Sequence, residues 1–394
     1  MKVLWHTIRL LLGLVFIFSG FVKGIDPWGS AFKFTDYFTA WGMESLTPLA
    51  FILGILLSAT EFITGLALVA NVFVTFFSWV ALLFMGFFTA ITLVVAVSNP
   101  VTDCGCFGDA LILTNWQTFW KNIVLLAFAV HVFFFRKTYM PARQSLVAVI
   151  MSGATVLVFA YLVDYSYKHL PIIDFRPYKI GANIPQGMLI PENAPREVYE
   201  NTFYYKNKLT GKQERFTQDN YPWQDSLTWE FVSMDSKLIQ KGYEPPIQNF
   251  TIETPDGEDI RDFFLYDENY TFILVAYDLA KADKSKTEQI KFLSHYALDT
   301  GMNFIGLSST SFDEAEQFVL ANEFPFEFFN CDEITLKTII RSNPGLVLLK
   351  NGTIVDKWHY NDIPTVDEFI KQRAYLDKLN LSASGTDEEK DTDR

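Results

Sequence analysis

Five long apolar runs dominate the first part of this chain. They lie at residues 3–22, 49–69, 72–97, 116–135 and 146–163. A helix needs about 20 residues to cross the hydrocarbon core of a bilayer, and each run is close to that length or longer. One such run could equally be a buried helix of a globular domain, but five in succession are hard to bury that way. The sequence therefore predicts an α-helical transmembrane bundle of about five spans, in contact with a lipid bilayer.

The first apolar run could instead be a secretory signal peptide. Its apolar stretch is longer than the usual core of such a peptide, which has about 7–15 residues. No small-x-small cleavage site follows it, and residues 18–24 have the composition of a helix end. We therefore expect the run to be retained as the first span.

The distribution of basic residues predicts how the bundle is oriented. Lys2 and Arg9 lie near the N-terminus, and the loop after the fourth run carries Arg136, Lys137 and Arg143. The opposite loops are poor in basic residues, and cytoplasmic loops carry an excess of Lys and Arg. We expect a bacterial inner (cytoplasmic) membrane protein with a cytoplasmic N-terminus and, after five spans, a periplasmic C-terminal domain.

Charge separates the two halves of the chain. Residues 1–170 hold nine Lys/Arg and seven Asp/Glu, which leaves 23 of the 32 basic and 38 of the 45 acidic residues for the second half. The net charge of −13 therefore belongs to the second half. Phosphate binding needs clustered Lys and Arg, so this balance argues against a nucleic-acid partner.

The sequence Asp-Cys-Gly-Cys-Phe-Gly-Asp at residues 103–109 carries the strongest chemical signal. Cys104 and Cys106 lie on the predicted non-cytoplasmic side, where disulfides can form. A Cys-x-Cys disulfide would close a small, strained ring that exchanges readily, and Gly105 and Gly108 supply the necessary backbone freedom. The alternatives are two small residues in a tight turn, or half of a metal site. No His lies in the loop and Cys331 is the only other thiol, so we predict no metal.

Glu61 lies in the middle of the second apolar run. A carboxylate at membrane depth is a candidate functional group, and it could relay a proton or bind a polar headgroup. It could also be a structural partner for a lysine or a hydroxyl inside the bundle. Lys121 in the fourth run is one possible partner, although its side chain could equally reach the membrane interface.

The rest of the chain divides by composition. We expect residues 1–140 to form the main bundle, 141–165 the fifth helix, and 166–246 an ordered extracytoplasmic connector with a strand–turn–strand at 204–214. Residues 247–375 alternate between strand and helix patterns and end in a hairpin, which predicts an α/β domain. Residues 376–394 are acidic and poor in apolar residues, so we expect disorder.

The membrane half resembles a known superfamily. The segment 13–23, the aromatic loop 26–42, the pair Glu61/Gly65 and the Cys-Gly-Cys-Phe-Gly sequence together resemble DoxX-like proteins over roughly residues 1–140. The cysteine loop is most similar to the MauE (methylamine utilisation protein) branch. That resemblance implies disulfide handling by Cys104 and Cys106, in the maturation of a disulfide-rich amine dehydrogenase subunit alongside a thioredoxin-like partner.

The α/β region resembles thioredoxin-like domains of the TlpA or peroxiredoxin kind. In that family a cis-proline precedes the final hairpin, and Pro344 matches its position, so we predict a cis Asn343–Pro344 bond. The family's Cys-x-x-Cys should follow the first central strand, but residues 276–285 contain no cysteine. Without a thiol nucleophile we expect this domain to be redox-inactive and to bind or dock a partner. Cys331 has the setting of a buried small residue rather than a reactive thiol.

Two functions follow as expectations. The first is thiol–disulfide handling, or maturation of envelope proteins, through Cys104 and Cys106. The second is a non-catalytic scaffold or assembly factor whose thioredoxin-like domain binds an envelope partner. No cofactor is evident from the sequence. A quinone could accept electrons from the cysteine pair, but no sequence feature demonstrates that it does. A small-molecule transporter that uses Glu61 has little support, because no repeats are visible among the spans.

Overall fold

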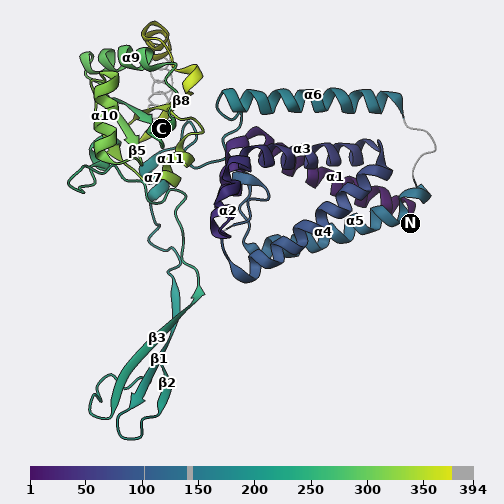
Figure 1. Cartoon of the computed structure of the whole chain (residues 1–394), viewed down its shortest axis with the longest axis horizontal. Coiled ribbons are helices and arrows are strands. Elements are labelled where there is room, and N and C mark those ends of the chain that lie inside the picture. The colour runs from purple at the N-terminus through teal and green to yellow at the C-terminus, as the bar shows by residue number, and fades with distance from the viewer. Residues whose placement is uncertain (102, 140–144, 375–394) are drawn as a thin grey trace, which may run out of the picture. The chain divides into compact units, whose positions relative to one another are not determined.

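The computed structural model describes residues 1–101, 103–139 and 145–374 (Figure 1). Residues 183–250 form one compact unit, and the remaining described residues form another. The two units are described separately. The acidic segment 376–394, for which the sequence predicts disorder, lies outside the described residues, and so does Arg143.

Five helices in the described chain are long and apolar enough to cross a membrane, as the sequence predicts. They are α1 (Lys2–Ile25), α3 (Ala50–Ala70) with the preceding 3-10 turn η1 (Glu44–Leu49), α4 (Val74–Ser98), α5 (Asn115–Tyr139) and α6 (Leu146–Lys168). Large apolar side chains such as Leu83, Phe87 and Leu157 are exposed on them. That exposure fits a surface solvated by lipid rather than by water.

The helices α1 and α3 cross at very short range. A Cβ atom added to Gly20 would lie 2.5 Å from the backbone nitrogen of Phe62, and one added to Gly65 would lie 2.5 Å from the carbonyl oxygen of Gly13. Small residues at such crossings let transmembrane helices pack backbone against backbone. This packing places Lys23, one turn after Gly20, beside Glu61.

The other spans assemble around this crossing. Trp5, Leu12 and Phe16 of α1 pack with Met85 of α4 and Val132 of α5 in one apolar cluster. α4 and α5 run side by side, as do α1 and α3, and the two pairs diverge toward the short helix α2 (Pro27–Ala40) (Figure 1). The fifth span packs on the bundle mainly through Phe159, whose ring stacks on Phe62 at a centroid distance of 4.0 Å.

The C-terminal domain contains a five-stranded sheet with the order β6-β5-β4-β7-β8. Its strands are β4 (Tyr270–Val275), β5 (Asn303–Ser308), β6 (Phe328–Asn330), β7 (Gly345–Lys350) and β8 (Thr353–His359). β4, β5 and β6 are parallel, whereas β7 and β8 are antiparallel to their neighbours. This is the thioredoxin-like arrangement that the sequence predicts, and the Asn343–Pro344 bond directly before β7 is cis.

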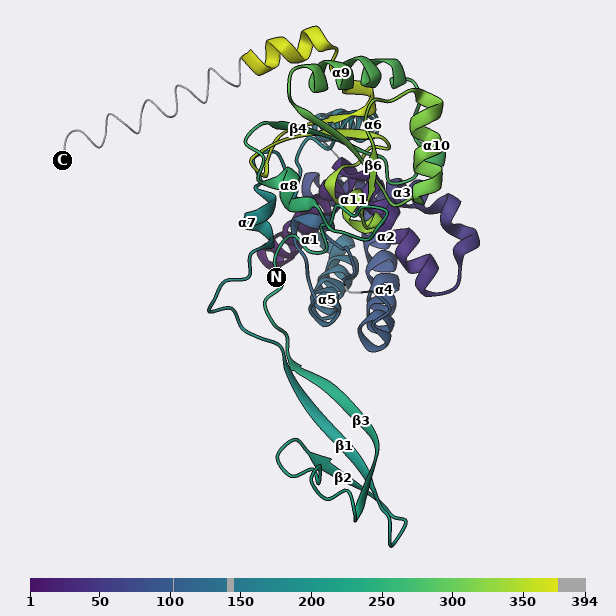
Figure 2. The ribbon, with the colours of Figure 1, turned by 90° about the vertical axis from the view of Figure 1, so that its left-hand side faces the viewer.

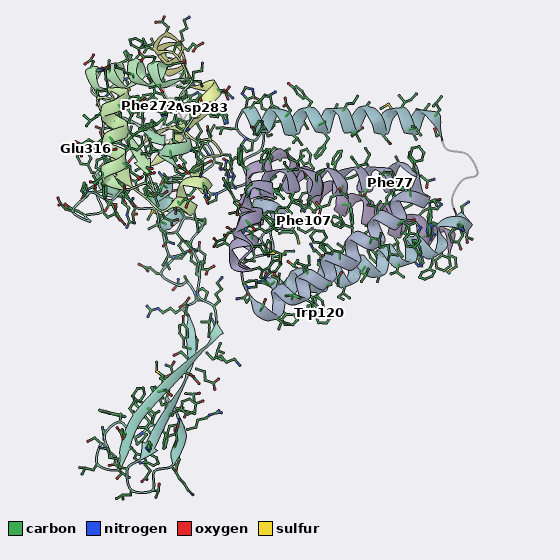
Figure 3. All side chains as sticks on the ribbon, viewed as in Figure 1. Phe77, Phe107, Trp120, Phe272, Asp283 and Glu316 are labelled. Atoms are coloured by element: carbon green, nitrogen blue, oxygen red, sulfur yellow. The ribbon has the colours of Figure 1, made fainter. Side chains whose placement is uncertain are left out.

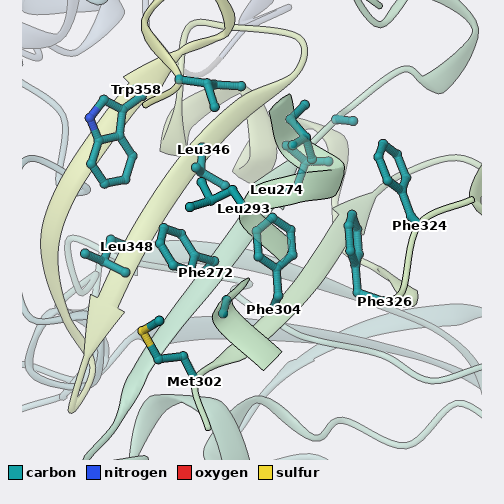
Figure 4. Packing of buried hydrophobic residues seen from close by; sticks show 14 of the residues in the cluster. Phe272, Leu274, Leu293, Met302, Phe304, Phe324, Phe326, Leu346, Leu348 and Trp358 are labelled. Carbon is teal, nitrogen blue, oxygen red and sulfur yellow. The ribbon is translucent and has the colours of Figure 1, made fainter. Parts of the chain in front are cut away.

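Helices connect and cover the strands of this sheet. They are α8 (Arg261–Leu265), α9 (Thr287–Asp299), α10 (Phe312–Asn322) and α11 (Glu333–Ile339), with 3-10 turns η3 (Leu279–Lys281) and η4 (Tyr360–Asp362). Phe272, Phe304 and Leu348 of the sheet pack with Leu293 of α9 in a continuous apolar core (Figure 4). Burial of that core is the main force that stabilises the domain.

The unit of residues 183–250 contains α7 (Ile184–Met188) and a three-stranded antiparallel sheet of order β2-β1-β3. Its strands are β1 (Val198–Asn207), β2 (Gln213–Thr217) and β3 (Trp229–Gln240), and they form a long twisted ribbon (Figure 2). The hairpin of β1 and β2 matches the predicted strand–turn–strand. The sequence analysis missed β3, because adjacent apolar residues such as Phe231 and Val232 fall on opposite faces and obscure the two-residue alternation.

Candidate functional site

The cysteine loop joins the end of α4 to the start of α5, and Asn115 fixes its two ends. The buried Asn115 side chain donates from Nδ2 to Asn99 Oδ1 at 2.7 Å and to the Val101 carbonyl at 2.8 Å. Its Oδ1 atom accepts a hydrogen bond from Cys104 Sγ at 3.2 Å. The first residue of α5 therefore positions the first cysteine.

The conformation of the loop requires its glycines. Gly105 and Gly108 have φ of 61° and 51°, values that favour glycine. A Cβ atom on Gly105 would lie 3.0 Å from Cγ of Lys33 on α2. The same Lys33 forms an ion pair with Asp103 at 2.8 Å. Both glycines therefore supply backbone freedom that the conformation of this loop requires.

Lys23 connects the loop to the membrane carboxylate. Its Nζ atom lies 2.8 Å from Oε1 and 2.7 Å from Oε2 of Glu61, and both side chains are buried. It also donates to the Cys106 carbonyl at 2.8 Å and to Ser19 Oγ at 2.8 Å. Ser19 in turn donates to the same Cys106 carbonyl at 2.7 Å. A buried charge is tolerated when it is paired in this way.

The suggested pairing of Glu61 with Lys121 is wrong. Lys121 Nζ lies over the ring of Phe107, 4.2 Å from its centroid, and Glu61 is paired with Lys23 instead. The close crossing of α1 and α3 brings Lys23 to Glu61. No local sequence pattern singled out Lys23 as the partner of Glu61.

Both loop cysteines are half-buried and carry free thiols, and Cys331 is a separate, buried thiol at the end of β6. The pKa of Cys104 is raised to about 11, chiefly by burial and secondly by the nearby Cys106. A hydrogen bond from Tyr37 opposes this shift. Burial also raises the pKa of Cys331 to about 12. Only a thiolate is a good nucleophile, and burial disfavours the thiolate form of both Cys331 and Cys104.

The loop forms one wall of a cavity of about 460 Å³. Its other walls come from α1, α2, α3, α4 and α5, with contributions from the segment after α6 and from α11, and they include Lys23, Tyr37, Glu61, Phe84 and Lys121. The side chain of Phe107 lies where the two helix pairs diverge (Figure 3). Cys104, Cys106, Gly105, Gly108 and Glu61, all singled out from the sequence, thus meet at one place.

Arg341 of the C-terminal domain reaches the same region. Its Nε atom donates to both carboxylate oxygens of Asp26, at 3.1 and 3.0 Å, and its Nη2 atom donates to Asp109 at 3.0 Å. Burial raises the pKa of Asp109, and the Arg341 charge opposes that shift. Asp26 also caps α2 by accepting from the Gly29 amide at 2.9 Å. One buried guanidinium therefore holds both the cysteine loop and α2.

The position that carries Cys-x-x-Cys in thioredoxin-like enzymes lies against α2. Tyr277, just after β4, packs edge-on against Phe32 of α2 at 6.2 Å between ring centroids. Lys337 of α11 lies 4.8 Å from the same Phe32 ring. Asn343, before the cis-proline, donates to the Asp278 carbonyl at 2.8 Å. This edge of the domain is a contact surface for the bundle.

A third charged cluster holds the segment after α6 on β8. Asp174 accepts from Arg176 Nε at 2.7 Å and from Lys357 Nζ at 2.9 Å. Burial alone would raise the pKa of Asp174, but the charges of Arg176 and Lys357 outweigh it and lower the pKa to about 2. No local sequence pattern indicated the pair of Lys357 with Asp174 or the pairs of Arg341, because their members are far apart in the chain.

Two segments of the chain match family models. Residues 1–135 match the family model described as Methylamine utilisation protein MauE. The match covers α1 to most of α5, and so includes both loop cysteines, Lys23 and Glu61. The MauE part of the resemblance is thus confirmed, whereas the wider DoxX-like assignment stays a prediction. Residues 199–241, which form most of the three-stranded sheet, match a domain of unknown function, DUF8463.

No curated protein matches the chain. Solved structures that are similar to part of it include three that follow. A candidate protein disulfide isomerase from Bacteroides thetaiotaomicron has 13% identity and a TM-score of 0.26, and the match covers 33% of this chain and 85% of that one. An uncharacterized conserved protein from Geobacillus kaustophilus has 12% identity and a TM-score of 0.23, with 27% and 64% covered. StoA from Bacillus subtilis has 18% identity and a TM-score of 0.22, with 27% and 84% covered.

Proposed function

We propose that this membrane protein exchanges disulfides with an envelope protein client through Cys104 and Cys106. The observation that carries the proposal is the placement of these two thiols. They share a short, anchored loop on the wall of a cavity, and the redox-fold domain of the same chain is held against that loop by Arg341. Strained or exposed cysteine pairs are the labile and catalytic ones among disulfides.

The exchange balances as follows. A client thiolate attacks the Cys104–Cys106 disulfide, forms a mixed disulfide with one sulfur and releases the other as a thiolate. The second client thiolate then attacks the mixed disulfide and releases the remaining loop sulfur. The client loses two electrons and two protons, and the loop gains them as two thiols.

The proposed location follows from the charges at the two ends of the bundle. Arg136 and Lys137 lie in the last turn of α5, opposite the end that carries the cysteine loop. Positive residues favour the cytoplasmic side, so we place the loop and the C-terminal domain on the outer face of a bacterial inner membrane. The most specific form of the proposal is that the client takes part in methylamine utilisation. This form rests only on the description of the matched family.

Trapping of the mixed disulfide tests the proposal. Cys104→Ser and Cys106→Ser variants of the full chain are expressed in cells, and free thiols are alkylated before non-reducing electrophoresis. We expect one single variant to accumulate a covalent adduct with a client that reductant releases. The double variant is the control and should form none. Absence of an adduct in both single variants, with a normal client oxidation state in the double variant, would sink the proposal.

A non-catalytic assembly factor is the second candidate. The observation that favours it is the thioredoxin-like edge, which has Tyr277 where a cysteine would be needed and is packed on α2. On this view the chain binds a partner without thiol chemistry. A partner that co-purifies equally well with the wild type and with the Cys104→Ser/Cys106→Ser variant would support this function over the first.

A further inference from the structure

The cavity beside the cysteine loop has the size and lining of a small-molecule site. Its volume of about 460 Å³ falls within the range of about 300–1,000 Å³ that such sites occupy. Most of its wall is apolar, with aromatic rings such as Phe16, Phe84 and Phe88 from α1 and α4. The occupant must therefore be largely apolar.

A few polar groups interrupt this apolar lining close to the cysteines. Lys23 and Glu61 form a paired, buried couple on one wall, and Lys121 and Tyr37 lie on others. Ammonium and phenol groups donate hydrogen bonds to carbonyl oxygens. The arrangement suits a ring that carries carbonyl groups and lies near two thiols.

The cavity also reaches the lipid-facing surface. Phe87 contributes to its wall, yet that side chain is 61% exposed on α4. An occupant with a long hydrocarbon tail could therefore leave its tail in the bilayer while its ring enters the cavity. A water-soluble oxidant would gain nothing from such an opening.

We propose that this cavity binds the ring of a lipid-soluble quinone that reoxidises Cys104 and Cys106. This inference rests on the proposed function, because a loop that oxidises clients becomes a dithiol and must then lose two electrons. Two S–H bonds break and one S–S bond forms. The quinone takes up the two electrons and two protons and leaves as a hydroquinone. Lys121, whose ammonium lies over the Phe107 ring on the cavity wall, is the donor placed to hold a carbonyl oxygen.

Stoichiometric quinone reduction tests the inference. The full chain, with Cys331→Ala to remove the third thiol, is reconstituted in lipid nanodiscs, reduced, freed of reductant and kept anaerobic. Duroquinone is the probe, because its four methyl groups prevent addition of thiols to the ring. We expect about one hydroquinone per chain and the loss of two alkylatable thiols, and no reaction in the Cys104→Ser/Cys106→Ser variant.

A pair of substitutions on α4 tests the cavity itself. Ile91 lines the cavity, whereas Leu93, two residues later, is exposed and does not line it. Ile91→Trp should slow quinone reduction at least tenfold, and Leu93→Trp should leave it unchanged. Oxidation of the loop by oxidised glutathione should be the same in both, which shows that the thiols remain competent.

The outcomes separate this inference from the proposed function. If the mixed disulfide with a client forms but duroquinone is not reduced, the quinone site is refuted and the exchange function stands. If neither occurs, the exchange function fails as well. Equal quinone reduction in the Ile91→Trp and Leu93→Trp variants would show reaction outside the cavity and would also overturn the inference.

Discussion

In a thioredoxin-like enzyme the fold and a cysteine pair belong to one domain. In this chain the fold belongs to the C-terminal domain and the cysteine pair belongs to the membrane bundle. The domain has the five-stranded fold and the cis-proline but no cysteine at the end of β4. The bundle has two thiols in one short loop but none of that fold. A thioredoxin-like fold therefore does not by itself supply thiol chemistry, which depends on the particular side chains placed on the fold.

The two regions also differ in what stabilises them. A continuous aromatic and aliphatic core holds the C-terminal domain together. The cysteine loop buries the Phe107 ring and is tied to its surroundings by polar and charged groups. Lys33, Lys23 and Arg341 each contact a different part of it. We therefore expect single charge substitutions to destabilise the cysteine loop more than they destabilise the C-terminal domain.

Removal of both loop cysteines should have the largest effect. We expect the Cys104→Ser/Cys106→Ser chain to lose thiol exchange by at least about 100-fold, because no other accessible thiol remains in the described chain. Reduction of a labelled disulfide peptide by the reduced full chain is the measurement. Cys331→Ala is the matched control and should keep its activity. Substantial exchange by the double variant would show that Cys104 and Cys106 are not the exchanging thiols.

Replacement of Arg341 should have the next largest effect. Arg341→Met leaves Asp26 and Asp109 without their buried partner, and breaking such a pair costs about 3–5 kcal/mol. We expect a lower midpoint of unfolding and faster alkylation of Cys104 and Cys106.

Lys168→Gln serves as the control for Arg341→Met. It removes an exposed pair with Asp164 and should change stability by less than about 1 kcal/mol. Equal effects of the two variants would show that Arg341 does not hold the loop.

Acid should weaken the C-terminal domain through His359. Burial lowers the pKa of His359 to about 4, below its ordinary value of about 6.5. Between these values the unfolded chain binds a proton that the folded chain does not, so stability falls as the pH falls from about 6.5 to 4. We expect a loss of about 1–2 kcal/mol, after allowance for solvent screening.

His359→Gln should remove this part of the pH dependence, measured by denaturant unfolding of the full chain in detergent at several pH values. An unchanged pH profile in the variant would contradict the role of His359.

The smallest effect is expected at Gly105. Gly105→Ala adds backbone strain at a φ of 61° and a Cβ atom 3.0 Å from Lys33, which together should cost about 1–2 kcal/mol. We expect the alkylation rate of the loop cysteines to rise several-fold. Gly301→Ala has a similar φ of 76° but open space around the new atom. If both variants leave the loop unchanged, the contact with Lys33 does not shape it.

Much of the fold could be predicted from the sequence, because it depends on local pattern. The apolar runs predicted the five spans, and the alternation of strand and helix signals in residues 247–375 predicted the α/β domain with its final hairpin. Pro344 could be placed from its position before the last hairpin. β3 was missed because its apolar residues occupy both faces.

The site was less accessible to sequence reasoning. Cys104, Cys106, Gly105, Gly108 and Glu61 are conspicuous by residue type and spacing alone. Their partners are not, because Lys23 is separated from Glu61 by 38 residues and Arg341 from Asp26 by 315. Only the folded chain makes such pairs neighbours, and no spacing rule connects them.

Asp26 couples the docking of the C-terminal domain to the start of α2. The same carboxylate caps α2 and accepts from Arg341. Coupling between two such events is reciprocal, so any change that strengthens the docking of Arg341 must favour the start of α2 by the same free energy, and the reverse also holds. A ligand that orders α2 would therefore tighten the C-terminal domain on the bundle, and detachment of that domain would loosen the helix that faces the cysteines.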